Sequence, residues 1–353
     1  MTTRDQIETP ALVVNTPLAL ANITRFQAHC DAAGLALRPH IKTHKLIQFA
    51  EAQIAAGAIG ITCQKLSEAE VMASAGITDI LITFNIVGPA KLARLRALSG
   101  QVAHLAVVAD NPAVIDGLAE AFADAARELV VLIECETGAR RCGVMTAAAA
   151  CARAQQIAAA PGLRFGGLMT YPPKQSGDAV PRFMNEARAG LAAAGLACPV
   201  ISSGGSPEMW NAARHGVITE YRIGTYIYHD RNQVLAGAAD WADCAAHLLA
   251  TVVSTPEPGR AVIDAGSKSL TSDRAAEPGH GHVLGRPDIT ITALSEEHGV
   301  LTHDPDQPLA IGTRLAIIPN HICPVSNLFD AIWLEDAHGT CRLTAVDARG
   351  GVT

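Results

Sequence analysis

The sequence predicts an α/β fold class, with a (β/α)8 barrel in residues 1–235 and a smaller β-rich domain in residues 236–353. Two observations lead to this prediction. Over the first two thirds of the chain, short apolar runs alternate with alanine-rich helical stretches, as expected for strands buried on both faces of a parallel sheet. Beyond residue 236 the strand-like runs continue, but long helical stretches become scarce.

The barrel prediction rests on repeated strand–helix units. Strands are expected at residues 11–15, 59–64, 79–84, 104–110, 129–135, 165–171, 198–205 and 218–226. Helices are expected between them, at residues 17–33, 66–76, 88–98, 111–126, 146–160 and 182–194. Helices rather than hairpins between strands indicate βα units, and about eight units in roughly 230 residues fit a closed barrel better than an open sheet. The doubly wound alternative would need a G-x-G-x-x-G fingerprint, which does not follow the first strand.

The last third of the chain is expected to be a β domain. Its strand-like runs are separated by turn residues and lie at residues 248–259, 260–270, 288–301, 313–323, 331–336 and 341–346. Hydrophobic residues make up 49% of the chain, so both domains have enough apolar side chains for a buried core.

Composition excludes several classes of partner. The formal net charge of −7 disfavours nucleic acid and anionic membranes. No apolar run reaches about 18 residues, so a membrane span is not expected. The nine cysteines form no C-x-x-C pair, and the N-terminus lacks the features of a signal peptide. These features predict a cytoplasmic protein with reduced thiols.

Lys42, in the segment RPHIKTHK, is the first candidate for chemistry. If residues 35–41 form a strand, Arg38, His40 and Lys42 share one face. The carboxyl end of a barrel strand faces the active site. A lysine in a partly desolvated barrel mouth, beside other cations, is a usable amine nucleophile and could form a Schiff base with an aldehyde cofactor. The alternative interpretation is a solvated basic loop.

Two glycine-containing segments near the expected last strands could bind a phosphate. SSGGS, residues 202–206, follows an apolar run, and backbone N–H groups with hydroxyls at such a turn can hold an anion. YRIGTY, residues 221–226, ends the next run. Barrels often bind phosphate after strands seven and eight. Ordinary glycine turns are the alternative.

Two further motifs carry candidate ligands. Arg141, between glycines in ETGARRCGV, could face a phenolate or carboxylate, or could be a surface arginine. His321 and Cys323 lie two residues apart at the end of a strand-like run, and imidazole with thiolate suits zinc or a similar divalent ion. Two residues are not a full ligand set, and a lone H-x-C is more often structural. Asp264, Ser267 and Lys268 form a polar group that could contact substrate or a second subunit.

In their order and spacing, the motifs resemble those of the D-threonine aldolase/D-serine dehydratase family. These are fold-type III pyridoxal phosphate enzymes with an N-terminal barrel similar to that of alanine racemase. The resemblance spans nearly the whole chain and rests on RPHIKTHK, CQKLSEAE, ETGARRCGV, GLMTYP, SSGGSP, YRIGTY, DAGSKSLTSD, EEHG and PNHICPVSNLFD.

The resemblance implies a role for each candidate. Lys42 would attach the cofactor covalently, Tyr171 would border the substrate, and Arg222 would face the pyridine nitrogen. His321 and Cys323 would bind a divalent metal (Mn, Mg or Zn) beside the substrate β-hydroxyl, and the cysteine favours zinc. The remaining cofactor residues would be Gln64 and Arg141 at the ring and its phenolic oxygen, and Ser203, Gly204, Gly205, Gly224, Thr225 and Tyr226 at the phosphate.

The activity that the resemblance implies is a lyase reaction on a D-3-hydroxy amino acid. RPHIKTHK, CQKLSEAE and VSNLFD favour retro-aldol cleavage to glycine and an aldehyde. Two departures leave an alternative open. His-x-Cys is more typical of the dehydratases, which give an oxo acid and ammonia from D-serine or D-threo-3-hydroxyaspartate. YPPK places Lys174 where many members have a histidine.

Two other classes were weighed. Non-catalytic proteins of pyridoxal phosphate homeostasis share this barrel, but they lack a second domain. A racemase would need a tyrosine from the C-terminal domain, and no tyrosine follows residue 236. By analogy with other fold-type III enzymes, a homodimer is expected.

Overall fold

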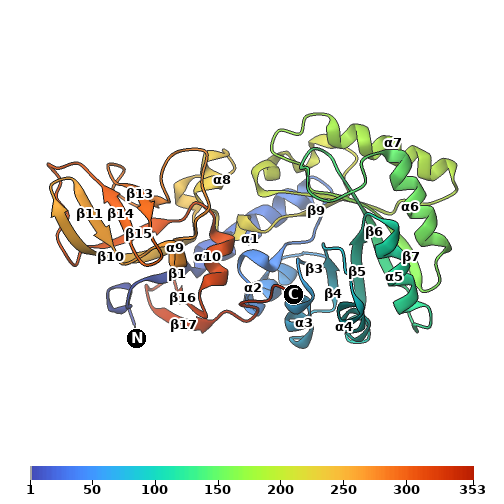
Figure 1. The fold of residues 1–353 in the computed structure, drawn as a ribbon, viewed down its shortest axis with the longest axis horizontal. Coiled ribbons are helices and arrows are strands. Elements are labelled where there is room, and N and C mark those ends of the chain that lie inside the picture. Colours follow the sequence, from blue (N-terminus) through green and yellow to red (C-terminus); the bar gives the residue numbers. More distant parts are fainter. Residues whose placement is uncertain (1) are drawn as a thin grey trace. The chain divides into compact units, whose positions relative to one another are not determined.

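The computed structural model describes residues 2–353, apart from the side chain of His215, and the chain forms two compact units (Figure 1). The barrel unit comprises residues 25–42, 47–224 and 351–353. The β unit comprises the residues up to Thr24, together with 43–46 and 225–350. In the described part of the chain, no helix has both the length and the apolar character needed to cross a membrane.

The barrel unit is built on a curled sheet of eight parallel strands in the order β2-β9-β8-β7-β6-β5-β4-β3. The strands are β2 (Ala36–Leu37), β3 (Ile61–Cys63), β4 (Asp79–Ile82), β5 (His104–Ala109), β6 (Leu129–Cys135), β7 (Leu163–Thr170), β8 (Val200–Gly204) and β9 (Glu220–Arg222). Main-chain hydrogen bonds join its two ends: Thr62 N donates to Pro39 O at 2.7 Å, and Ile59 N donates to Leu37 O at 3.0 Å. The predicted fold class is confirmed.

Helices connect these strands, as predicted: α2 (Ile47–Ala55), α3 (Leu66–Ser74), α4 (Pro89–Ser99), α5 (Pro112–Phe122), α6 (Ala147–Ala159), α7 (Ala179–Ala193) and the 3₁₀ helix η3 (Ser206–His215). Helix α5 shows why such a segment is helical. Asn111 Oδ1 accepts a hydrogen bond from Val114 N at 3.1 Å and caps the helix, and Pro112 suits its first turn. The apolar side of α5, including Leu118 and Phe122, is fully buried.

The expected first barrel strand lies in the other unit, which is a correction to the sequence prediction. Strand β1 (Ala11–Asn15) pairs antiparallel with β10 (Ala246–Glu257) and parallel with β16 (Ala331–Glu335). The short β2 takes its place in the barrel. A run such as ALVVN reads equally well as a buried strand of either sheet, so long-range pairing decides where it goes. The compact units consequently differ from the ranges 1–235 and 236–353, because the N-terminal segment groups with the β unit.

The β unit contains a nine-stranded sheet with the path β13-β14-β11-β10-β1-β16-β17, to which β15 is added through β10 and β12 through β15. Its other strands are β11 (Arg260–Ile263), β12 (His282–Val283), β13 (Thr290–Leu294), β14 (Gly299–Thr302), β15 (Arg314–Ile318) and β17 (Cys341–Ala345). The helices are α8 (Arg231–Leu235), α9 (Ser267–Leu270) and α10 (Ile322–Leu328), while α1 (Thr16–Ala32) begins here and ends in the barrel unit. The region after residue 236 is therefore rich in strands.

Replacing Leu12 with alanine tests the position of β1. Leu12 is fully buried in β1, so the cavity left by its truncation should lower the free energy of unfolding by about 2–5 kcal/mol. Leu20, on α1, is 40% exposed, and its alanine variant should stay within about 0.5 kcal/mol of the wild type. Urea unfolding followed by circular dichroism measures both. Equal midpoints for the two variants would contradict the burial of β1.

Candidate active site

The candidate cofactor residues of the barrel unit follow the carboxyl ends of its strands. Lys42 follows β2, Gln64 follows β3, Arg141 lies after β6, Tyr171 follows β7, Ser203 and Gly204 end β8, and Arg222 ends β9. Because all eight strands are parallel, their carboxyl ends meet at one edge of the sheet. The structure therefore gathers these residues at the edge where barrel enzymes hold their substrates.

Lys42 lies in the 3₁₀ helix η2 (Ile41–Thr43) and not in a strand. The expected shared face of Arg38, His40 and Lys42 is therefore wrong, because strand alternation ends before the lysine. The main chain still follows β9: His40 N donates to Ile223 O at 2.7 Å. The Lys42 side chain is partly buried, and its amine has no hydrogen-bond or ion-pair partner within the part of the chain that the structure describes.

His40 and Gln64 support the turn that carries Lys42. Gln64 Nε2 donates to Thr83 O at 2.8 Å, so Gln64 Oε1 is left as an acceptor for His40 Nε2 at 3.2 Å. His40 Nδ1 accepts from Lys42 N at 3.3 Å. One ring nitrogen donates and the other accepts, which assigns the neutral Nε2–H tautomer to His40. A polar chain thus links the end of β4 to the main chain of Lys42.

Arg222 is a buried cation at the end of β9. Its side chain donates from Nε to Ser202 Oγ at 2.8 Å and from Nη2 to Thr170 O at 2.6 Å. Burial lowers the pKa of Arg222, while the carboxylates of Glu220 and Glu134 oppose this shift. The guanidinium is consequently held by hydrogen bonds to residues of two other strands, β7 and β8.

Arg141 lies against a carboxylate and an aromatic ring. Its Nη2 is 3.6 Å from Glu134 Oε1, and its Cζ lies 4.8 Å from the centroid of the Tyr171 ring. Burial raises the pKa of Glu134, whereas Arg141 and Arg222 lower it. Glu134 was missed by the sequence analysis. The sequence did contain an indication of its role. Glu134 is a carboxylate in the apolar run LVVLIEC, and a buried carboxylate needs charged neighbours.

The SSGG segment leaves a hydroxyl and a glycine turn at the end of β8. Ser203 is only 3% exposed, and its hydroxyl makes no hydrogen bond within the described chain. A Cβ on Gly204 would lie 2.2 Å from Arg222 O, so the close approach of β8 and β9 requires glycine there. Gly205 has a φ of 122°, a conformation suited to glycine, and its carbonyl accepts from the Tyr221 hydroxyl at 2.7 Å.

The second predicted phosphate segment divides between the units. Gly224 ends the barrel unit, whereas Thr225 and Tyr226 begin the last part of the β unit. Both residues belong to the 3₁₀ helix η4 (Thr225–Ile227), in which Tyr226 is fully buried. A phosphate-binding role for Thr225 and Tyr226 stays a prediction.

The predicted metal residues lie at the start of α10 in the β unit. His321 occupies the N-cap position of this helix without a capping hydrogen bond from its side chain, and its Nδ1 lies 2.6 Å from Asp273 Oδ2. Cys323 Sγ lies 3.1 Å from Thr43 Oγ1 and 3.7 Å from Thr225 Oγ1. Burial alone would lower the pKa of His321, but contacts with Cys323 and Asp273 raise it to about 9.

Asp273 is the residue that sequence reasoning missed in DAGSKSLTSD. The polar residues singled out there have other partners. Asp264 accepts from Thr251 N at 2.7 Å, and Lys268 pairs with Glu297 on the surface. Among the side chains that the structure describes, no three His, Cys, Asp or Glu residues are arranged to hold a metal ion. His321 and Cys323 remain two candidate donors, and Asp273 contacts the imidazole.

The chain is similar to known proteins over most of its length. Residues 17–232 match the family model of the alanine racemase N-terminal domain, and residues 245–334 match that of the putative serine dehydratase domain. The chain is 38% identical to D-threonine aldolase of Arthrobacter sp over 344 residues, covering 93% of this chain and 89% of that protein. It is 33% identical to D-threo-3-hydroxyaspartate dehydratase of Delftia sp. (strain HT23) over 369 residues, covering 95% and 96%.

Among solved structures, D-threonine aldolase from Filomicrobium marinum superposes with a TM-score of 0.90 at 30% sequence identity, covering 99% of this chain and 98% of that one. Both units are therefore matched by one known architecture. The chain belongs to the D-threonine aldolase/D-serine dehydratase family, whose N-terminal domain is of the alanine racemase type.

Proposed function

We propose that the protein is a lyase that uses pyridoxal phosphate and a divalent metal to cleave D-3-hydroxy amino acids into glycine and an aldehyde. One observation carries the proposal: the amine of Lys42 has no partner in the described chain, and it follows a strand whose carboxyl end lies at the same sheet edge as Arg222 and Ser203. The high similarity to a D-threonine aldolase supports the choice of reaction.

The side chains of the barrel unit fit a phosphorylated aldehyde cofactor. Lys42 offers the amine for covalent attachment, and the Ser203 hydroxyl with the Gly204–Gly205 turn offers donors for the phosphate. Arg141 can donate to the phenolic oxygen. When bound, the cofactor supplies an electron sink for negative charge that develops at the substrate Cα.

Arg222 would determine the protonation state of the ring nitrogen of the cofactor. A guanidinium carries only hydrogen-bond donors, so a ring nitrogen that faces Arg222 must accept and stay unprotonated. Its charge is retained because Glu134 and Glu220 are close. Gln64 and Tyr171 would border the ring and the substrate, and the Arg141 guanidinium over Tyr171 would restrict the movement of that phenol.

His321 and Cys323 are proposed to hold the metal, which would polarise the substrate β-oxygen when bound. The donors fit a divalent ion, and the thiolate favours zinc over manganese or magnesium. Water and substrate oxygens would complete the ligand set, as in catalytic sites that keep an open position. A structure of D-threo-3-hydroxyaspartate dehydratase with alanine in place of a cysteine is a metal-free form, which supports a role for cysteine.

Dehydration is the second candidate reaction, and the His-x-Cys pair favours it. It differs from cleavage in the proton that is removed: from Cα for dehydration, and from the β-hydroxyl for cleavage. Lys174, on an exposed part of the loop after β7, stands where a histidine base was expected. The similarity to the Delftia dehydratase also supports this alternative.

Product analysis separates the candidate functions. Enzyme loaded with pyridoxal phosphate and Zn²⁺ or Mn²⁺ is incubated with D-threonine or D-serine, with L-threonine as the control. We expect glycine and acetaldehyde from D-threonine and no product from the L-isomer. Oxo acid and ammonia as the main products would establish dehydration instead. Cofactor binding without turnover of any D-3-hydroxy amino acid would indicate the non-catalytic class.

Asp273→Asn is expected to weaken metal binding about 10- to 100-fold. The carboxylate contacts Nδ1 of His321 and so orients Nε2 as a ligand, and loss of such a partner typically has this effect. Isothermal titration of the metal-free protein with Zn²⁺ measures the affinity. The control is Asp306→Asn, which makes the same change at an exposed residue of the same unit. This variant should bind Zn²⁺ as the wild type does. Equal affinities for both variants would show that Asp273 does not support the ligand.

A further inference from the structure

A row of hydrogen-bonded charges crosses the interior of the barrel unit and ends at Arg222. It begins where Asp79 Oδ1 accepts from Arg38 Nη1 at 2.5 Å. Arg38 Nε donates to Glu220 Oε2 at 2.8 Å. Ser202 Oγ donates to Glu220 Oε1 at 2.5 Å and accepts from Arg222 Nε at 2.8 Å. Each link is charged or charge-assisted, which makes these hydrogen bonds stronger than neutral ones.

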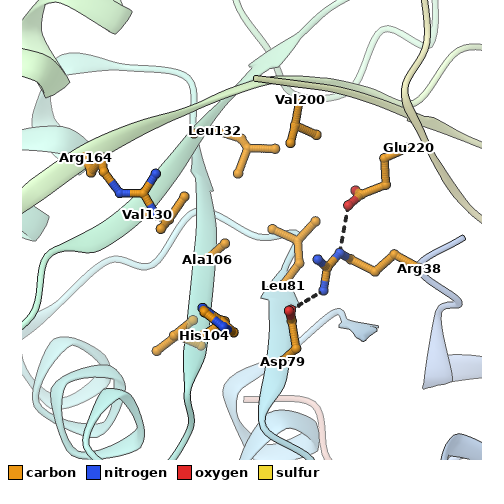
Figure 2. A pocket seen from close by; sticks show the side chains of 12 residues that line it. Arg38, Asp79, Leu81, His104, Ala106, Val130, Leu132, Arg164, Val200 and Glu220 are labelled. Carbon is orange, nitrogen blue, oxygen red and sulfur yellow. Dashed lines mark hydrogen bonds and ion pairs between the residues drawn. The ribbon is translucent and has the colours of Figure 1, made fainter. Parts of the chain in front are cut away.

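The row starts at the amino ends of the strands, opposite the candidate site. Figure 2 shows Arg38 between Asp79 and Glu220, at a cavity of about 180 Å³ that is also lined by His104 and Arg164. Asp79, His104 and Glu220 are the first residues of β4, β5 and β9. The side chain of Arg38 is 12% exposed and that of Glu220 only 5%. The side chain of Asp79 is 32% exposed, so the row begins near solvent and is buried from Glu220 to Arg222.

Ser202 connects the carboxylate of Glu220 to the guanidinium of Arg222. It is fully buried and has a single hydroxyl proton, which Glu220 accepts, so its lone pairs face Arg222 Nε. Without this hydroxyl, a buried guanidinium N–H and a buried carboxylate oxygen would each lose a partner. Within the described chain, Thr170 O would then be the remaining hydrogen-bond acceptor of the Arg222 guanidinium, and a single hydrogen bond leaves the guanidinium plane free to turn.

We propose that Ser202 and Glu220 are positioning residues that hold the Arg222 guanidinium in the orientation that meets the ring nitrogen of the cofactor. Arg38 fixes Glu220 from the amino ends of the strands. The inference rests on the proposed function, because it assigns a purpose to Arg222 only when a pyridine ring is bound. It goes beyond that function because it makes Ser202 and Glu220 determinants of cofactor binding. Both residues lie in the sheet interior, remote from the loops that carry Lys42 and Arg141.

The first experiment measures cofactor affinity by titrating apoenzyme with pyridoxal phosphate and following absorbance. Ser202→Ala should raise the dissociation constant roughly 10- to 100-fold, as expected for loss of a buried charge-assisted hydrogen bond. Ser202→Thr keeps a hydroxyl and should restore most of the affinity. Ser269→Ala is the matched control: it removes another buried serine hydroxyl, which donates to Gly266 O. This control should bind the cofactor as the wild type does.

A second measurement separates positioning from a merely structural role. In an Arg222→Lys background, Ser202→Ala should change the dissociation constant less than about threefold, because residues that act through one another are not additive. Glu220→Gln, in which a neutral amide replaces the carboxylate, should raise the dissociation constant in the wild-type background. In the Arg222→Lys background the same substitution should leave the dissociation constant nearly unchanged. Crystals of the apo form of Ser202→Ala should show the guanidinium rotated away from its position in the wild type.

The outcomes distinguish this inference from the proposed function. Wild-type enzyme that binds no pyridoxal phosphate would overturn the proposed function. Wild-type binding with equal affinities for Ser202→Ala and Ser269→Ala would overturn the inference alone. Additive effects of Ser202→Ala and Arg222→Lys would also overturn it, since they would place the role of Ser202 in general barrel stability. If Ser202→Ala does not fold, Glu220→Gln replaces it. Additive effects of Glu220→Gln and Arg222→Lys on the dissociation constant would then overturn the inference.

Discussion

Lys42→Ala is expected to abolish turnover of D-3-hydroxy amino acids, with a loss on the order of 10⁴-fold or more. The reason is that the reaction would lose its covalent anchor, and the two lysines nearest in sequence are engaged by other residues. Lys45, three residues on, is buried and donates to Asn327 Oδ1 at 2.8 Å. Lys65 lies 3.8 Å from the centroid of the Phe84 ring. Neither neighbouring lysine offers an unengaged amine.

Borohydride reduction followed by peptide mass spectrometry measures the attachment directly. In wild-type enzyme the phosphopyridoxyl group should be found on the peptide that contains Lys42, and Lys42→Ala should carry none. Lys91→Ala, on the surface side of α4, controls for the loss of a lysine charge and should label and turn over normally. Stoichiometric labelling of Lys42→Ala at another lysine would refute the assignment of the anchor.

Removal of divalent metal by a chelator is expected to lower the turnover number at least about a hundredfold while the cofactor stays bound. The expected loss is that large because polarisation of the β-oxygen by a metal lowers the reaction barrier by several kcal/mol. The cofactor should stay because its candidate residues in the barrel unit do not include His321 or Cys323. Activity after dialysis, the cofactor absorbance and recovery on addition of Zn²⁺, Mn²⁺ or Mg²⁺ are the measurements.

The variants His321→Ala and Cys323→Ala should reproduce the chelated state and should not recover when metal is added. Cys142→Ala is the control for loss of a thiol, because Cys142 is exposed and lies outside the proposed metal site. Full activity of the metal-free wild type would exclude a catalytic metal. An unchanged metal affinity in Cys323→Ala would instead show that the metal binds at another site.

The segment RPHIKTHK shows how far the sequence could predict the site. Lys42 was identified from its motif, and the structure places it, partly buried, in the 3₁₀ helix η2 that follows β2. The shared face with Arg38 was wrong: a proline after Arg38 cannot donate to the strand ladder, and β2 ends at Leu37. Arg38 pairs with Glu220 and Asp79 at the other end of the strands. Lys45 is buried with a φ of 56°, which nothing in the local pattern indicated.

Partners that are far apart in sequence could not be predicted. Asp273 and His321 are 48 residues apart, and Ser202 and Arg222 lie on neighbouring strands 20 residues apart. A motif shows which chemistry a side chain can perform, but the partner depends on strand register. That register was settled by the pairing of Ser202 with Glu220 and of Gly204 with Arg222.

By itself, the sequence determined the fold class, the family motifs and the residue types at the candidate site. These follow from local properties: the period of apolar residues, helix caps such as Asn111, and glycines where β8 and β9 approach closely. Only the tertiary structure decided that β1 belongs to the β unit, that Arg222 is held by Ser202 and Glu220, and that Asp273 orients His321. The physical reason is that burial and hydrogen-bond pairing depend on contacts between segments that the chain separates by many residues.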